Sequence, residues 1–182
     1  MTAAAPRLPG DPSPEAAVAR MIRVDHAGEY GAVRIYEGQL AVLGKSQAGG
    51  VIREMAEQER RHLERFEKLV HERRVRPTAL SPLWHVAGYA LGAASALLGE
   101  RAAMACTVAV EEVIDDHYRR QAESLGEDQA QLRRTIEDFR ADELAHRDLA
   151  LAHGAGSAPA HDLLTATVKI GSRIAIWLST RV

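Results

Sequence analysis

Two copies of the pattern Glu-x-x-His constrain the fold of this chain more than any other feature. They are Glu59 with His62 and Glu143 with His146. On a helix, residues three apart share a face, so each pair can direct a carboxylate and an imidazole toward one point. In both copies the Glu and the His occupy the seam positions that face the core of a helical bundle. Their apolar neighbours on these seams are Ile52, Met55, Phe66 and Leu69 in the first copy, and Leu132, Ile136, Phe139 and Ala150 in the second.

A carboxylate in such a seam needs compensation, because burying an unpaired charge is costly. A single Glu-x-x-His on a charged helix is usually part of a solvated face. Two copies that both replace apolar seam residues instead favour a bound cation inside the bundle.

The two halves of the chain repeat the same order of residues. Glu29 precedes the first Glu-x-x-His by thirty residues, and Glu111 precedes the second by thirty-two. Tyr36 follows Glu29 by seven residues, as Tyr118 follows Glu111. A duplicated helix pair accounts for this order and predicts a pseudo-symmetric four-helix bundle with a long crossover.

One Glu from each of two helices, with Glu-x-x-His from each of the other two, is the ligand set of ferritin-like dimetal carboxylate proteins. We therefore expect an all-α, ferritin-like four-helix bundle with a crossover helix and an extra C-terminal helix. Ligands of this kind suit iron or manganese better than soft-ligand metals. One metal ion is expected to be held by Glu29, Glu59 and His62, and the other by Glu111, Glu143 and His146, with some of the carboxylates bridging.

The length of 182 residues favours one domain, and abundant Ala, Leu, Glu and Arg favour helix. We interpret residues 1–14 as a disordered tail and residues 15–182 as a single di-iron domain. Ser13 followed by Pro14 is a favourable helix start. The bundle helices are expected at about 14–44, 51–73, 101–125 and 128–153. A crossover helix is expected within 77–99 and a last helix after the glycines at 154 and 156.

The segment 77–99 contains no Asp, Glu, Lys or Arg. Two prolines interrupt its beginning, so it is too short to span a membrane. One face of it could lie on a membrane surface, and burial as a crossover helix is an equal alternative. The last helix combines apolar residues and Trp177 with Lys169, Arg173 and Arg181, which suits a membrane interface, packing on the bundle, or both.

Composition excludes several other classes. The net charge of −2 gives no indication of a nucleic-acid surface. The lone Cys106 allows neither an internal disulfide nor a cysteine-cluster metal site, including the rubredoxin-type iron centre of a rubrerythrin. No Gly-x-Gly-x-x-Gly follows a strand pattern, and no secretory signal is expected.

Four longer motifs carry a family resemblance. They are 23–32 (RVDHAGEYGA), 106–112 (CTVAVEE), 142–148 (DELAHRD) and 172–176 (SRIAI). Their sequence and order resemble the demethoxyubiquinone hydroxylase family, over about residues 21–182. A loop around Gly126 is shorter than in some members, and no mitochondrial presequence is expected.

The resemblance implies a di-iron monooxygenase of ubiquinone biosynthesis. It would hydroxylate the ring of a polyprenylated demethoxyubiquinol with dioxygen as co-substrate and electrons ultimately from NADH. The family's metal ligands fall on Glu29, Glu59, His62, Glu111, Glu143 and His146. The implied setting is a peripheral protein on the cytoplasmic face of a bacterial inner membrane. A homo-oligomer or other ubiquinone-biosynthesis proteins are possible partners.

Several residues near the expected site keep two interpretations. Tyr118 and Tyr36 could move protons or electrons, or could be hydrogen-bonded core residues. Asp25 and His26 could support the metal-binding histidines, or could be exposed or capping residues. Glu112 is expected to be exposed or to support a ligand, and Arg173 to meet an anionic group or be a simple surface charge.

Two other functions remain open. The first is a ferritin- or rubrerythrin-like iron-oxidising and storage protein, which needs the same ligands. The second is a non-enzymatic helical interaction module in which the seam acids form salt bridges to Arg. The apolar segment 77–99 favours the hydroxylase over storage.

Overall fold

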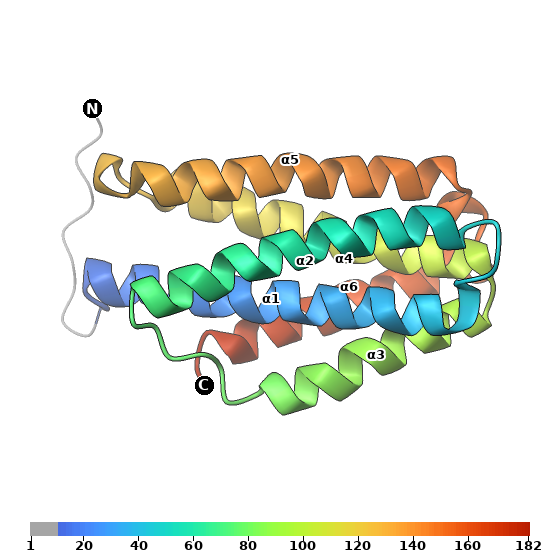
Figure 1. The fold of residues 1–182 in the computed structure, drawn as a ribbon, viewed down its shortest axis with the longest axis horizontal. Helices are drawn as coiled ribbons and strands as arrows, with labels where there is room; N and C mark the ends of the chain where they lie inside the picture. Colours follow the sequence, from blue (N-terminus) through green and yellow to red (C-terminus); the bar gives the residue numbers. More distant parts are fainter. Residues whose placement is uncertain (1–10) are drawn as a thin grey trace.

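The structure is a computed structural model that describes residues 11–182, and every regular element in this part of the chain is a helix (Figure 1). The expected all-α fold is therefore confirmed. The six long helices are α1 (Pro14–Leu43), α2 (Gly49–Glu72), α3 (Ser81–Leu97), α4 (Glu100–Ser124), α5 (Ala130–Ala152) and α6 (His161–Ser179). Two single turns, η1 (Glu127–Gln129) and η2 (Ala155–Ser157), precede α5 and α6.

The first helix begins where its sequence predicts. The Ser13 hydroxyl accepts a hydrogen bond from the Ala16 amide at 3.1 Å, and Pro14 occupies the first turn, where its missing amide hydrogen costs nothing. The expected tail at residues 1–14 lies mostly outside the described residues. The division of the chain into a tail at residues 1–14 and a domain at residues 15–182 therefore stays a prediction.

Four helices build the bundle around a polar centre. Helix α1 packs along α2, and α4 packs along α5, so that each half of the chain forms one helical hairpin. In the described residues, a small apolar cluster joins α4 to α6, and the two larger clusters lie one toward each end of the bundle. One contains Tyr36, Ile52 and Met104, and the other contains Phe66 and Ile136. The two Glu-x-x-His segments lie between these clusters.

The remaining helices, α3 and α6, pack on the same side of the bundle. Helix α3 lies mainly against α1, and α6 mainly against α4. In Figure 1, α3 runs along the lower edge and α6 lies behind α1. The expected crossover and C-terminal helices therefore occupy equivalent places, and the repeated unit comprises three helices instead of two.

Helix α3 contacts α1 through glycines and leaves its large apolar side chains outside. A Cβ atom on Gly92 would lie 1.9 Å from the Ile35 carbonyl oxygen, and one on Gly38 would lie 2.2 Å from the Tyr89 carbonyl oxygen. The buried residues of α3 are all small, whereas Leu83 and Val86 are more than half exposed. Of the two interpretations of segment 77–99, burial as a crossover helix therefore holds only for the small-residue face of α3 that meets α1. Among the described residues, none of the helices has the length and apolarity needed to cross a membrane.

Gly92→Ala tests this close packing. The added methyl group has no space beside the Ile35 carbonyl, so α3 must shift, and we expect the free energy of unfolding to fall by about 1–3 kcal/mol. Chemical denaturation measures it. Gly171→Ala is the matched control, because a Cβ there meets no atom within 4 Å. It should instead stabilise α6 by about 0.5–1 kcal/mol. Equal stability of the two variants would contradict the packing described here.

Candidate metal centre

Six buried side chains from four helices converge at the centre of the bundle. They form two groups of potential metal ligands whose donor atoms lie within 4.8 Å of one another. The first group contains Glu29, Glu59, His62 and Glu143, and the second contains Glu59, Glu111, Glu143 and His146. The structure thus brings together all six residues predicted from the sequence. Each group contains the expected three ligands and adds one Glu from the other half of the chain.

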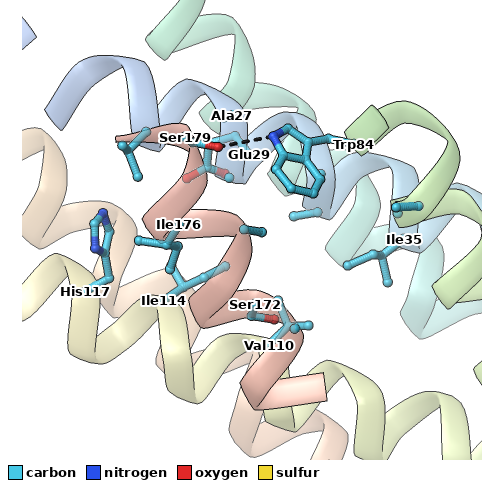
Figure 2. Close-up of a pocket in the computed structure, with 18 of the residues that line it drawn as sticks. Ala27, Glu29, Ile35, Trp84, Val110, Ile114, His117, Ser172, Ile176 and Ser179 are labelled. Carbon is cyan, nitrogen blue, oxygen red and sulfur yellow. Dashed lines mark hydrogen bonds between the residues drawn. The ribbon is translucent and has the colours of Figure 1, made fainter. Parts of the chain in front are cut away.

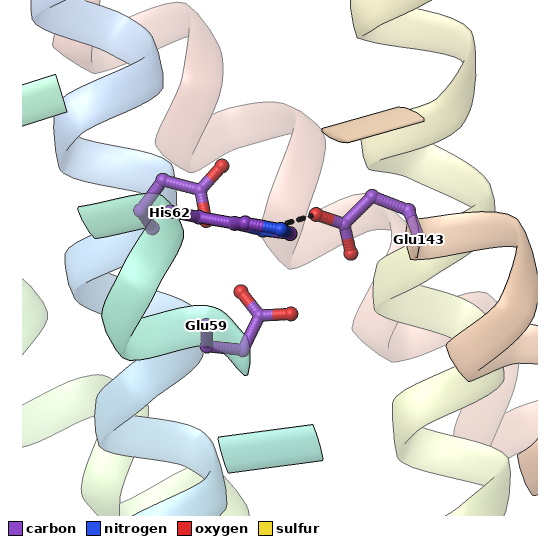
Figure 3. Close-up of side chains that lie close together, drawn as sticks. Glu59, His62 and Glu143 are labelled. Carbon is purple, nitrogen blue, oxygen red and sulfur yellow. Dashed lines mark ion pairs between the residues drawn. The ribbon is translucent and has the colours of Figure 1, made fainter. Parts of the chain in front are cut away.

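Helix geometry explains how the site is assembled. Glu59 and His62 are one turn apart on α2, and Glu143 and His146 are one turn apart on α5, so each pair points into the space between the hairpins. Figure 3 shows Glu59 and His62 facing Glu143 across this space. Glu59 and Glu143 belong to both groups, which places them where a carboxylate could bridge two cations.

Both histidines direct Nδ1 toward the centre. The Nδ1 atom of His62 lies 3.2 Å from a carboxylate oxygen of Glu143, and that of His146 lies 3.0 Å from one of Glu59. The opposite ring nitrogens have different partners: His62 Nε2 lies 3.0 Å from Asp142, and His146 Nε2 lies 3.2 Å from the Gln58 side-chain oxygen. Such contacts fix the ring orientation of a metal-binding histidine.

This finding corrects the expectation for Asp25 and His26. Neither is the partner that supports His62 or His146, since Asp142 and Gln58 occupy those positions. Asp25 instead contacts His117 and Gln121. The sequence did contain a signal for the true partners, because each one immediately precedes the Glu of the other half's Glu-x-x-His.

Tyr36 and Tyr118 each form a hydrogen bond to the glutamate that the other half of the chain contributes outside its Glu-x-x-His pair. The Tyr36 hydroxyl on α1 donates to Glu111 on α4 at 2.7 Å, and the Tyr118 hydroxyl on α4 donates to Glu29 on α1. Burial raises the pKa of both tyrosines well above the ordinary value, and the neighbouring carboxylates raise it further. Both are therefore hydrogen-bonded core residues that hold a predicted ligand, as one of the two interpretations stated.

The charges at the centre fit a cation. Burial raises the pKa of Glu59, Glu111 and Glu143, and repulsion among the carboxylates raises it further. Burial alone would lower the pKa of His62, but Glu143 and Glu29 raise it to about 11. Both oxygens of Glu59 and Glu143 and the Nδ1 atoms of both histidines are buried without a hydrogen-bond partner. Carboxylate oxygens and imidazole nitrogens that converge on one point in this way are suited to divalent iron or manganese.

An apolar cavity of about 430 Å³ lies beside the centre, between α1 and α4 on one side and α3 and α6 on the other (Figure 2). Glu29 and Tyr118 line its inner wall. Gly28 and Gly31 on α1 and Gly171 on α6 also line it, and a Cβ on any of them would meet no atom within 4 Å. These glycines therefore leave room in the cavity.

Glu112 and Arg173, whose roles the sequence left open, both lie outside the buried centre. Glu112 forms an ion pair with Lys169 of α6 and is partly exposed. Arg173 is exposed, on the face of α6 that carries Ile170, Ile174 and Trp177. Neither of the two is among the six converging side chains.

Comparison with known proteins agrees with this site. The sequence model of the family described as "Ubiquinone biosynthesis protein COQ7" matches residues 16–179. The chain belongs to this family. It is 60% identical over 177 residues to the 3-demethoxyubiquinol 3-hydroxylase of Rhodospirillum rubrum, covering 97% of this chain and 84% of the relative. It is 54% identical over 170 residues to the human mitochondrial NADPH-dependent 3-demethoxyubiquinone 3-hydroxylase, covering 91% and 78%. The resemblance to the demethoxyubiquinone hydroxylase family is thereby confirmed.

The raised pKa values predict how metal removal depends on pH. Protons bound to Glu59, Glu111, Glu143 and His62 stabilise the metal-free fold, because their pKa values are raised in the folded state. This stabilisation is complete below the unfolded pKa values of 4.5 for Glu and 6.5 for His. It is lost progressively as pH rises from there toward the folded pKa, which for His62 is about 11. A bound cation replaces those protons. The difference in Tm between metal-loaded and chelator-treated protein should therefore widen from pH 6 to pH 8, on the order of 5 °C. Scanning calorimetry measures both Tm values. A Tm difference that becomes smaller from pH 6 to pH 8 would contradict a cation at this centre.

Proposed function

We propose that this protein is a di-iron monooxygenase that hydroxylates the ring of a polyprenylated demethoxyubiquinol. The observation that carries the proposal is the apolar cavity that reaches Glu29, one of six buried carboxylate and imidazole ligands. A metal centre with an adjoining apolar cavity fits a lipid-like substrate that reacts at its polar ring. The relatives named for demethoxyubiquinone hydroxylation support the same assignment.

The metal ions would be held as the two groups of ligands suggest. Glu29 and His62 would bind one iron, Glu111 and His146 the other, and Glu59 and Glu143 would contact both. When bound, two ferrous ions supply electrons for the activation of dioxygen. We propose NADH as the ultimate electron source. The human relative carries NADPH in its name, so the choice of nicotinamide is a separate point to test.

The surrounding residues prepare the site for this chemistry. Tyr118 fixes Glu29, and Tyr36 fixes Glu111, so that the two ligands contributed singly by α1 and α4 keep one orientation. The apolar walls of α3 and α6 exclude water from the ring. The isoprenoid tail would follow the apolar lining outward between these two helices.

The alternatives account for less of the structure. An iron-storage protein would use the same ligands but has no use for an apolar cavity beside them. The interaction-module hypothesis required salt bridges from the seam acids to Arg. In the described structure, the ion pairs of Glu29, Glu59, Glu111 and Glu143 are with His62 and His146, so this hypothesis is wrong.

We also propose that the protein binds a membrane surface through α3 and α6. Helix α3 exposes Leu83 and Val86, and α6 exposes Ile170, Ile174 and Trp177. Arg173 and Arg181 flank the apolar face of α6, and Arg181 covers the Trp177 ring at 3.8 Å. Apolar residues with flanking cations suit the interface of an anionic bilayer. The cytoplasmic face of a bacterial inner membrane remains the proposed location, and a homo-oligomer or other ubiquinone-biosynthesis proteins remain proposed partners.

Glu143→Ala tests the central proposal. Because Glu143 belongs to both ligand groups, we expect the purified variant to lose most of its iron and all hydroxylation. In a strain that lacks this protein, mass spectrometry of lipid extracts should show a demethoxy intermediate, which the wild-type chain clears and Glu143→Ala does not. Glu137→Ala, at an exposed position of the same helix, is the control and should behave as wild type. An unchanged ubiquinone pool in the deletion strain would favour the iron-oxidising alternative. Activity retained by Glu143→Ala would remove that residue from the site.

The membrane proposal predicts the behaviour of a double variant, Ile170→Ser with Ile174→Ser. Both side chains are more than half exposed, so the fold should be little affected. Losing two apolar contacts should weaken binding to vesicles of phosphatidylcholine and phosphatidylglycerol by about tenfold or more, measured by co-sedimentation. Leu151→Ser on α5 is the control. Equal binding of all three proteins would exclude this face as the docking surface.

A further inference from the structure

The two halves of the bundle are not identical beside the cavity, and the difference identifies a group that the metal centre does not use. Asp25 lies four residues before Glu29, and Thr107 lies four residues before Glu111. Gln39 and Gln121 each follow the same glutamates by ten residues. The structure pairs these positions across the helices, because Gln121 donates to Asp25 at 2.7 Å, and Gln39 donates to Thr107 at 3.4 Å.

Only one of these pairs carries titratable groups and faces the cavity. Asp25 in the first half is equivalent to Thr107 in the second. His117 follows Glu111 by six residues, and the equivalent residue after Glu29 is Ile35. Asp25 and His117 both line the cavity, whereas Thr107 and Gln39 do not. Figure 2 shows His117 at one end of the cavity, on the same wall as Ile114 of α4.

The Asp25 carboxylate is held at one oxygen and unpaired at the other. Its Oδ1 lies 3.1 Å from His117 Nε2 and accepts the hydrogen bond from Gln121. The Nε2 atoms of His117 and Gln121 are themselves 2.9 Å apart, so the three groups form a closed triangle. The Oδ2 atom is buried and has no hydrogen-bond partner, and Asp25 as a whole is 2% exposed. A buried carboxylate oxygen without a donor is costly, so its place on a cavity wall indicates that a ligand supplies one.

We propose that Oδ2 of Asp25, positioned by His117 and Gln121, accepts a hydrogen bond from a ring hydroxyl of the quinol and so orients the ring beside the metal centre. This inference rests on the proposed function. Asp25 and Glu29 are one helical turn apart, about 5–6 Å between Cβ atoms. A ring anchored at Asp25 therefore extends along the cavity wall to Glu29. Glu29 and Asp25 are the two carboxylates in the lining, and Glu29 is engaged by Tyr118.

The arrangement distinguishes the reduced substrate from its oxidised form. Burial raises the pKa of Asp25, whereas the contacts of His117 and Gln121 with Oδ1 lower it and so favour the ionised form. In that form the free Oδ2 can only accept a hydrogen bond. A quinol O–H can donate to it, whereas a quinone has carbonyl oxygens alone. Asp25 thus favours binding of the quinol.

Asp25→Asn tests the proposal, because an asparagine held at its oxygen by Gln121 would place an NH₂ group where Oδ2 stood. Binding is measured anaerobically by calorimetry at pH 8 with three probes that share a ten-carbon tail: a demethoxyubiquinol, its quinone, and decylbenzene. We expect the variant to bind the quinol about tenfold more weakly, and the quinone and decylbenzene no more weakly than wild type does. Asp25→Thr, which copies the natural Thr107 and Gln39 pairing, should show the same loss for the quinol. Thr107→Val is the matched control and should bind all three probes normally.

The results separate this proposal from the one on which it rests. Iron content should be unchanged in every variant, and the KM for the quinol should rise more than kcat falls in Asp25→Asn. Normal quinol binding by Asp25→Asn and Asp25→Thr would overturn the role of Asp25, as would an equal loss for decylbenzene, since the residue would then only shape the cavity. Failure of the wild-type protein to hydroxylate the quinol would instead overturn the proposed function.

Discussion

Mutual repulsion of four buried carboxylates is the interaction on which the rest of this structure depends. The centre holds Glu29, Glu59, Glu111 and Glu143 together, and in the described part of the chain their ion-pair partners are His62 and His146. Such an arrangement is stable only if cations or protons neutralise it. The two apolar clusters that enclose it supply the free energy that holds the helices together around an unfavourable centre, and the crosswise tyrosine bonds keep two of the ligands oriented.

The ligand set could be read from the sequence because it depends on helical periodicity, which is a local property. Glu59 and His62 stand out as polar residues in an apolar seam, and their repetition at Glu143 and His146 removes the ambiguity of a single pair. The contacts of Asp142 and Gln58 could not be read in this way. Both are polar residues beside the seam, as many surface residues are, and only the register of α2 against α5 brings each to the opposite histidine.

The packing of α3 was ambiguous for a similar reason. An uncharged segment with many small residues can be buried, or can lie on an apolar surface. The choice depends on which face meets α1, and Gly88 and Gly92 determine it by allowing the backbones to touch while Leu83 and Val86 point outward. The role of Asp25 likewise depends on the cavity, which no local pattern describes. A position-by-position comparison of the two halves does single out Asp25. The Glu and Gln residues around it are repeated, whereas a carboxylate in one half is replaced by the threonine hydroxyl in the other.

Glu59 and Glu143 each belong to both ligand groups, and this has a consequence for the origin of the fold. Each group takes three residues from one half of the chain and one from the other, and the supporting contacts of His62, His146 and Glu111 also cross between halves. Neither half contains a complete site. A half-length ancestor could therefore have assembled such a centre only as a homodimer. Fusion of two gene copies would then have allowed equivalent positions in the two halves to diverge, as Asp25 and Thr107 have done.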